Sequence, residues 1–313
     1  MSVAFVFPGQ GSQAVGMGKD VAGAFPAAKE VFQEIDEALR QNLSKLMFEG
    51  PDDELILTEN AQPAIMAVSL AVMRVLTKDG GLDLAKSASF VAGHSLGEYS
   101  ALAAAGCFSL ADTARLLKTR GRAMQEAVPV GQGAMAALMG MELADAQAIA
   151  AEAAGDEVCA AGNDNAPGQV VISGSVAAVE RACEIAKAKG AKRAIMLPVS
   201  APFHCALMAP AADAMAEALA IVPMQPPVLP LVANITAGAV TDPVEIRSLL
   251  VEQVTGMVRW RESVLYLKAE GVDTLIEAGA GKVLSGMARR IDADLTGTAV
   301  GTPEAIEEFL KEL

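Results

Sequence analysis

The chain has 313 residues, of which 52% are hydrophobic, and it carries a formal net charge of −14. This length can bury a sizeable core and favours one large domain with a smaller insertion. The acidic balance excludes nucleic acid as the main partner, although it permits a local basic face.

The first 126 residues alternate between predicted strands and helices. In chain order these are a buried strand at 3–7, a buried helix at 61–77, a short strand at 90–92, a helix at 96–105 and a helix from 110 to about 126. Gly106 closes the fourth element, and Ser109 with Asp112 forms a capping box for the fifth. Strands followed by helices favour a parallel sheet covered on both faces.

A different pattern follows between residues 128 and 198. Strands are predicted at 133–141, 157–163, 168–174 and 192–200, and helices at 143–153 and 176–189. This β-α-β-β-α-β order is ferredoxin-like. We therefore expect a small inserted subdomain at 128–198, and a larger α/β-hydrolase-like subdomain with a parallel sheet built from 1–127 and 199–313. A helix at 205–221 followed by loop, and a strand–turn–helix at 272–291, complete the larger part.

Signals for targeting, membrane insertion and metal binding are weak. The segment MSVAFVFPGQGSQ lacks the basic region and cleavage site of a signal peptide. The uncharged stretches 194–212 and 218–241 are interrupted by prolines, so we expect neither to span a membrane. The four cysteines are widely spaced, which favours reduced core thiols, and there are only two histidines, His94 and His204. We expect a cytoplasmic protein without a metal.

Ser95 lies in the segment Gly93-His94-Ser95-Leu96-Gly97, between a predicted strand and a predicted helix. A G-x-S-x-G match alone is weak, but a sharp strand-to-helix turn lifts the serine hydroxyl above the sheet and aims a helix N-terminus at it. The backbone N–H of Leu96 is then a candidate oxyanion donor. The alternative is a plain turn that needs small residues.

A nucleophilic serine needs a base. His94 is adjacent, but consecutive side chains diverge at a sharp turn, so we expect it to pack beneath the turn. His204, in a loop before a helix, is then the candidate base. A third group should orient the imidazole. No single aspartate or glutamate stands out for this role, and a backbone carbonyl would also serve.

Arg120 lies on an apolar stripe of its predicted helix, beside Leu116, Leu117 and Met124. A buried arginine is costly unless it has an anionic partner. The pattern allows an internal salt bridge to an aspartate or glutamate as well as a bound anion.

Five segments resemble one known family, the malonyl-CoA:acyl-carrier-protein transacylases, which belong to the acyltransferases of fatty acid and polyketide synthesis. They are FVFPGQGSQ at 5–13, GHSLGEYSAL at 93–102, RGRAMQEAV at 120–128, SAPFHCALM at 200–208 and EAGAGKVLSGM at 277–287. The resemblance extends to about residue 290. The inferred α/β core with a ferredoxin-like insertion agrees with the fold of that family.

The resemblance implies ping-pong transfer of a malonyl group from malonyl-CoA, through Ser95, to the phosphopantetheine thiol of acyl carrier protein. His204 would act as base and then as acid. The backbone N–H groups of Gln10 and Leu96 would form the oxyanion hole, and the Gln253 region would offer its main-chain carbonyl to His204. The family therefore needs no acidic third group.

The same resemblance assigns Arg120 to the free carboxylate of the substrate, which a guanidinium can bind bidentately. Acetyl-CoA should then be a poor substrate. Phe203 would crowd a 2-methyl branch, a steric effect of about 1–3 kcal/mol. Gln62, Asn163 and Met124 would line the cleft.

The implied partner, acyl carrier protein, is strongly acidic, so a local basic face should guide its docking. Residues 181–193 carry five basic side chains against one acid, and we hypothesise that they dock the carrier together with Arg289 and Arg290. The alternative is a solvated amphipathic helix. We expect a monomer that binds no cofactor of its own.

Two other functions stay open. A serine esterase or thioesterase would share the nucleophile and the base but would pass the acyl group to water. A non-catalytic carrier-binding module would not become acylated.

Overall fold

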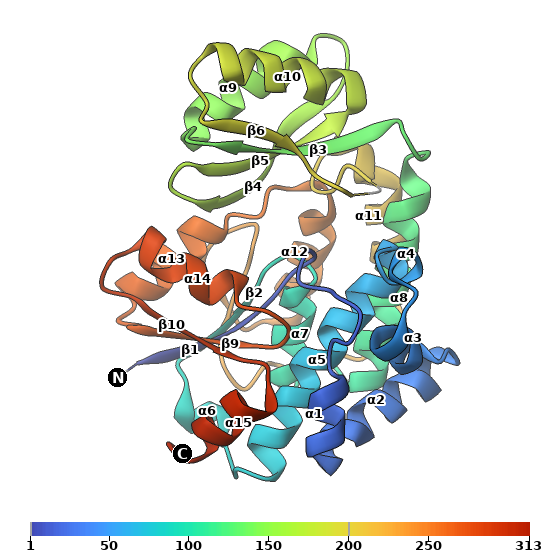
Figure 1. Cartoon of the computed structure of the whole chain (residues 1–313), viewed down its shortest axis with the longest axis vertical. Helices are drawn as coiled ribbons and strands as arrows, with labels where there is room; N and C mark the ends of the chain where they lie inside the picture. The colour runs from blue at the N-terminus through green and yellow to red at the C-terminus, as the bar shows by residue number, and fades with distance from the viewer. Residues whose placement is uncertain (1, 200) are drawn as a thin grey trace.

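In a computed structural model, the chain forms two sheets with helices around them (Figure 1). The structure describes residues 2–199 and 201–313. Ser200, which ends the strand predicted at 192–200 and begins the 200–208 motif, lies outside the described residues, as does Met1. Within the described part of the chain, no helix combines the length and the apolar character needed to cross a membrane.

The larger sheet has six strands in the order β10-β9-β1-β2-β7-β8, all parallel except for β8. The strands are β1 (Val3–Phe7), β2 (Phe90–Gly93), β7 (Leu231–Val232), β8 (Ala239–Val240), β9 (Thr274–Ala278) and β10 (Thr296–Val300). In β1 the side chains alternate between two core clusters, with Phe5 and Phe7 in one and Ala4 and Val6 in the other. Both faces are therefore covered, as expected of a mainly parallel sheet.

Helices cover both faces of this sheet. They are α1 (Lys19–Ala24), α2 (Pro26–Leu39), α3 (Leu43–Glu49), α4 (Asp52–Leu55), α5 (Thr58–Lys78), α6 (Leu84–Ser87), α7 (Gly97–Ala104), α8 (Leu110–Ala127), α11 (Ala209–Ile221), α12 (Pro243–Thr255), α13 (Trp260–Ala269), α14 (Val283–Ile291) and α15 (Pro303–Leu310). The cluster of Phe5 and Phe7 includes side chains of α5, α7 and α8, whereas that of Ala4 and Val6 includes side chains of α13 and α14.

The smaller sheet is antiparallel, with the order β4-β5-β3-β6. Its strands are β3 (Gly133–Met139), β4 (Cys159–Ala166), β5 (Gln169–Ser175) and β6 (Arg193–Met196), and its helices are α9 (Leu143–Ala154) and α10 (Val176–Ala188). A third core cluster joins the helices to the sheet, and Figure 1 shows both helices on the side away from the larger sheet. The predicted fold class is thus confirmed, while the exact subdomain boundaries stay predictions.

Several elements differ from the sequence-based expectation. The strand predicted at 192–200 ends at Met196, before Leu197 and Pro198. The helix predicted at 205–221 is a 3-10 turn, Ala206–Met208, followed by α11. The prediction of a loop after residue 221 is wrong in part, because the segment before residue 272 contains α12 and α13. A start signal for α12 was present in the sequence: Asp242 caps the Val244 N–H and is followed by a proline at the first helical position.

Candidate active site

The strand-to-helix turn at Ser95 requires glycine on both sides. Ser95 itself has a φ of 55°, an unfavourable conformation for a residue with a side chain. A Cβ atom at Gly93 would lie 1.9 Å from the carbonyl oxygen of Gly97, and one at Gly97 would lie 2.2 Å from that of Phe7. The turn therefore leaves no room for larger residues at either position, and it presents the Ser95 side chain at the end of β2.

Asn234 holds this turn from a distant part of the chain. Its side-chain oxygen accepts a hydrogen bond from the Ser95 N–H at 2.8 Å, and its side-chain nitrogen donates to the Gly93 carbonyl at 2.7 Å. Asn234 is fully buried. The sequence analysis did not identify it, because nothing in the local sequence links it to a position 139 residues earlier.

Ser95 and His204 form a hydrogen-bonded pair, with 2.8 Å between Oγ and Nε2. Nδ1 of His204 lies 2.9 Å from the main-chain oxygen of Gln253 and 3.1 Å from that of Gly256. Because carbonyl oxygens only accept, the Nδ1 atom carries the proton and Nε2 is free to accept from the serine. Two carbonyls thus occupy the place that an acidic residue holds in a catalytic triad.

The imidazole of His204 is only 4% exposed. Burial, together with the nearby Arg120 cation, lowers its pKa to about 3. The ring is therefore neutral near pH 7, which is the state that can take a proton from Ser95.

The Arg120 guanidinium is buried, with 1% exposed, and contacts neutral groups only. Nη1 donates to the side-chain oxygen of Gln62 at 2.8 Å. Nη2 donates to the side-chain oxygen of Gln253 at 2.8 Å and to Ser95 Oγ at 3.1 Å. Across the described residues, the guanidinium forms no ion pair with an aspartate or glutamate, so the internal salt bridge considered above is not observed.

These groups open into one cavity of about 340 Å³. The predicted site residues that line it are Gln10, Gln62, Ser95, Arg120, Met124, Asn163, Phe203 and His204. Leu96 and Gln253 are buried behind its wall. Both subdomains contribute to the cavity, because Met135 and Asn163 belong to the smaller sheet.

The N–H groups of Gln10 and Leu96 remain available near the serine. Within 2–199 and 201–313, neither N–H donates a hydrogen bond. The loop that carries Gln10 packs closely on the turn, since a Cβ atom at Gly9 would lie 2.6 Å from the His94 carbonyl oxygen. The side-chain oxygen of Gln10 accepts from Thr58 Oγ1 at 3.0 Å.

The ring of His94 packs away from the Ser95–His204 pair. Its Nε2 lies 2.9 Å from the side-chain oxygen of Asn165, and its centroid lies 5.8 Å from that of the fully buried Trp260. It is not the hydrogen-bond partner of the Ser95 hydroxyl; that partner is His204.

The basic run at 181–193 is less positive than its sequence indicates. Arg181 pairs with Glu157, Lys187 with Glu184, and Lys189 with Glu152, at 2.6–2.7 Å. Two of these three acids come from outside the run, so ion pairs reduce the positive charge that these three side chains present to solvent.

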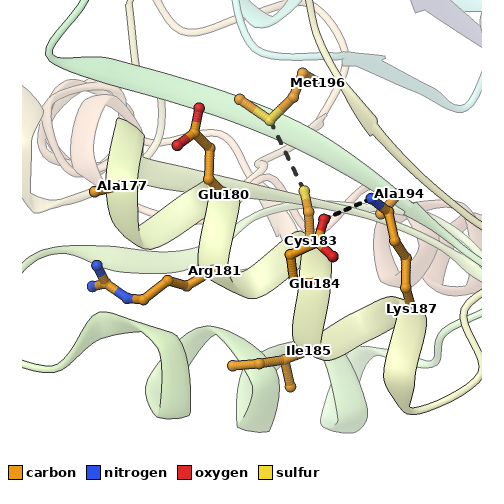
Figure 2. Close-up of a pocket in the computed structure, with 9 residues that line it drawn as sticks. All are labelled: Ala177, Glu180, Arg181, Cys183, Glu184, Ile185, Lys187, Ala194 and Met196. Carbon is orange, nitrogen blue, oxygen red and sulfur yellow. Dashed lines mark hydrogen bonds and ion pairs between the residues drawn. The ribbon is translucent and has the colours of Figure 1, made fainter.

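Figure 2 shows this face of α10, where a shallow pocket separate from the Ser95 cavity is lined by apolar side chains, by Glu180 and by the ion-paired Arg181, Glu184 and Lys187. Cys183 contacts the Met196 sulfur at 3.9 Å, and burial raises the pKa of its thiol. The pocket therefore holds no activated nucleophile. In the described part of the chain, no three His, Cys, Asp or Glu side chains are grouped so that they could hold a metal ion.

Comparisons with known proteins agree with this geometry. Residues 4–290 match the model of a family described as the acyl transferase domain. The chain is 48% identical to the malonyl CoA-acyl carrier protein transacylase of Escherichia coli K12, covering 98% of each chain. It is 47% identical to the corresponding protein of Bacillus subtilis, covering 99% of this chain and 97% of the relative.

Solved structures give the same result. A crystal structure of acyl-carrier-protein-S-malonyltransferase from Bartonella henselae is 57% identical, with a TM-score of 0.97, covering 100% of this chain and 99% of the other. A complex described as a type II PKS acyl-carrier protein with its malonyl-transacylase is 42% identical, with a TM-score of 0.96, and both chains are covered in full. The chain therefore belongs to the acyl transferase family, among the malonyl-CoA:acyl-carrier-protein transacylases.

Proposed function

We propose that this enzyme transfers the malonyl group from malonyl-CoA to the phosphopantetheine thiol of acyl carrier protein and so supplies extender units for fatty acid synthesis. One observation carries the proposal. The Ser95–His204 pair, at 2.8 Å, shares a cavity with a buried arginine that contacts no carboxylate. The pair provides acyl transfer, and the arginine selects an acyl group that carries its own negative charge.

In the first half-reaction, His204 Nε2 takes the hydroxyl proton as Ser95 Oγ attacks the thioester carbonyl. The carbon–sulfur bond then breaks, and the CoA sulfur leaves with the proton that His204 returns. In the second half-reaction, the phosphopantetheine thiol gives its proton to His204 as its sulfur attacks the malonyl-serine ester. The carbon–oxygen bond of the ester then breaks, the malonyl group stays on the sulfur, and His204 returns the proton to Ser95 Oγ. The N–H groups of Gln10 and Leu96 stabilise the oxyanion in both steps.

Arg120 binds the free carboxylate of the malonyl group. Its Nη2 already lies 3.1 Å from Ser95 Oγ, so a carboxylate two carbons beyond the reacting carbonyl can reach the guanidinium without leaving the serine. Gln62 holds the other nitrogen, and Met124, Asn163 and Phe203 bound the space around the acyl chain.

The decisive experiment mixes the protein with malonyl-CoA alone and measures its intact mass. A transferase stops at a stable adduct with the mass of one malonyl group, and Ser95→Ala abolishes that adduct. A hydrolase would instead release CoA continuously, and a non-catalytic carrier-binding module would not be acylated. Continuous CoA release would refute malonyl transfer.

The carrier protein docks on a basic strip formed by Lys192, Arg193, Arg289 and Arg290. Two contacts support this choice over Arg181, Lys187 and Lys189. Lys192 lies against Gly140, whose N–H donates to the Gly168 carbonyl, and Arg290 donates to the neighbouring Gln169 side chain. The strip therefore spans both subdomains, and among the described residues its cations form no ion pair.

Charge reversal tests this docking surface. Lys192→Glu with Arg290→Glu should raise the KM for the carrier protein at low salt and leave malonyl loading unchanged. Lys189→Glu is the matched control, because that lysine is already paired with Glu152. Equal KM values for the two variants would contradict the strip. The division at 128–198, the monomeric state and the cytoplasmic location stay predictions.

A further inference from the structure

Glu98 is a buried carboxylate that the reaction above does not use. It lies in the first turn of α7, three residues after Ser95, and its side chain is 1% exposed. One of its oxygens, Oε2, accepts from the Gln253 side-chain nitrogen at 2.8 Å and from the Asn234 N–H at 3.1 Å. A buried carboxylate costs free energy, so its place beside the nucleophile requires a reason.

Gln253 connects this carboxylate to the arginine. Its side-chain nitrogen donates to Glu98 and, at 2.9 Å, to the Ser95 carbonyl, while its side-chain oxygen accepts from Arg120 Nη2 at 2.8 Å. An amide can sit in either of two orientations. Burial raises the pKa of Glu98 to about 7, so above that pH the carboxylate is ionised and only accepts. It then holds the NH₂ end towards itself and the oxygen towards the guanidinium.

The opposite orientation would be unfavourable at both ends. The amide oxygen would face the carboxylate, and the NH₂ group would face the guanidinium, which has no acceptor. The other amide that contacts Arg120, that of Gln62, also turns its oxygen to the guanidinium, but its nitrogen donates to a neutral group, Thr58 Oγ1, at 3.0 Å. A charged acceptor, Glu98, therefore lies behind the Gln253 amide alone, beside the neutral Ser95 carbonyl.

We propose, on the basis of the malonyl transfer described above, that Glu98 is a positioning residue that orients Arg120 for the substrate carboxylate through the side-chain amide of Gln253. The intervening amide explains why the buried cation has no contacting acid. A carboxylate in direct contact would occupy the edge of the guanidinium that the substrate needs, whereas Glu98 supports the positive charge from behind Gln253 and leaves that edge open.

The test compares Glu98→Gln with the wild type for malonyl-CoA and for acetyl-CoA at pH 8, where the Glu98 carboxylate is ionised. The variant keeps the shape and an acceptor oxygen but loses the charge that sets the amide. We expect the KM for malonyl-CoA to rise about tenfold to a hundredfold, as for a charged hydrogen bond, with a smaller change in kcat. Use of acetyl-CoA should hardly change, so the preference for malonyl over acetyl should fall by the same factor.

Glu277→Gln is the matched control. Glu277 is also fully buried and accepts from the backbone of Leu284 and Ser285, but it has no contact with Arg120 or Gln253. We expect it to reduce stability and to leave the malonyl preference intact. A similar loss of preference in both variants, or an unchanged preference in Glu98→Gln, would overturn the positioning role.

A second variant covers the case in which Glu98→Gln does not fold. The double exchange Glu98→Gln with Gln253→Glu keeps the net charge but moves the carboxylate into contact with Arg120. We expect strongly impaired malonyl loading and relatively better acetyl loading. Wild-type selectivity in this exchange would refute the proposal. Failure of the proposed function looks different, because the wild type itself would then form no malonyl adduct.

Discussion

The Ser95 cavity and the exposed face of α10 differ in how their cations are paired. On α10, Arg181, Lys187 and Lys189 are each paired with a glutamate at 2.6–2.7 Å. In the cavity, Arg120 is buried, and within the described residues its hydrogen bonds go to amide and hydroxyl oxygens. An exposed ion pair contributes little to stability, and its cation already has an acidic partner. A buried cation without a contacting acid instead keeps its affinity for an anion. The difference indicates that pairing decides which cations can bind an anion: Arg181, Lys187 and Lys189 are already paired with acids, whereas Arg120 is not.

The largest expected effect comes from removing the base in the cavity. His204→Ala should slow malonyl loading by roughly 10²- to 10⁴-fold, because the serine loses its proton acceptor. Stopped reactions followed by intact-protein mass measure this rate. Loading within a few-fold of the wild type would show that another group deprotonates Ser95.

A pair of arginine substitutions tests the contrast directly. Arg120→Ala should reduce kcat/KM for malonyl-CoA by about tenfold to 150-fold, since a charge-assisted contact contributes about 1.5–3 kcal/mol, and the relative use of acetyl-CoA should improve. Arg181→Ala on α10 should change neither value. Equal losses for both acyl donors in Arg120→Ala would contradict the carboxylate contact.

The buried imidazole also predicts how stability depends on pH. The pKa of His204 is about 3 in the folded protein against an ordinary 6.5. Below pH 6.5 the unfolded chain therefore binds a proton that the folded protein does not, and the free energy of unfolding decreases as pH falls. Between pH 7 and pH 5 the wild type should lose about 2 kcal/mol relative to His204→Gln.

Glu98 has the opposite effect on the pH dependence of stability. Burial raises its pKa to about 7 from 4.5, so between these pH values the folded state binds a proton that the unfolded chain does not. This contribution of Glu98 cancels in the difference in unfolding free energy between the wild type and His204→Gln, since both proteins retain Glu98. Urea unfolding at three pH values provides the measurement. Parallel stability curves for the two proteins would argue against a neutral buried imidazole.

The smallest effect is expected on the exposed face. Lys187→Ala removes the pair with Glu184, whose side chains are 54% and 75% exposed. Such pairs contribute about 0–1 kcal/mol, so the urea midpoint should hardly move and malonyl loading should not change. A large loss of stability would mean that the two regions differ less than we infer.

Much of the fold could be predicted from local patterns. Strands β1 and β2 and helices α5, α7 and α8 lie where the sequence placed them, because apolar periodicity and capping residues act over short distances. Strands β7 and β8 were not predicted, since each has only two residues and forms through pairing with a neighbour. Helices α12 and α13 were missed although α12 carries a clear start signal.

The site residues also divide into those that the sequence predicted and those that it missed. Ser95, His204 and Arg120 could be chosen from a turn motif, a count of histidines and an apolar stripe, and the resemblance to a family named Gln10 and Gln253. Asn234, Thr58 and Glu98 were not identified as members of the site. Asn234 and Glu98 form hydrogen bonds with residues far along the chain. Thr58 accepts a hydrogen bond that orients the Gln62 side chain.

The amino-acid sequence alone therefore predicted the candidate reactive residues and the kind of fold that carries them, because small residues, capping groups and apolar stripes express local chemistry. Folding in three dimensions decided which charges stay unpaired. Glu157 and Glu152 pair with Arg181 and Lys189 at α10, while no acid among the described residues contacts Arg120, and both outcomes depend on contacts between distant segments. Desolvation and pairing are set by such contacts, so the strength of the anion site could not be read from any single stretch of residues.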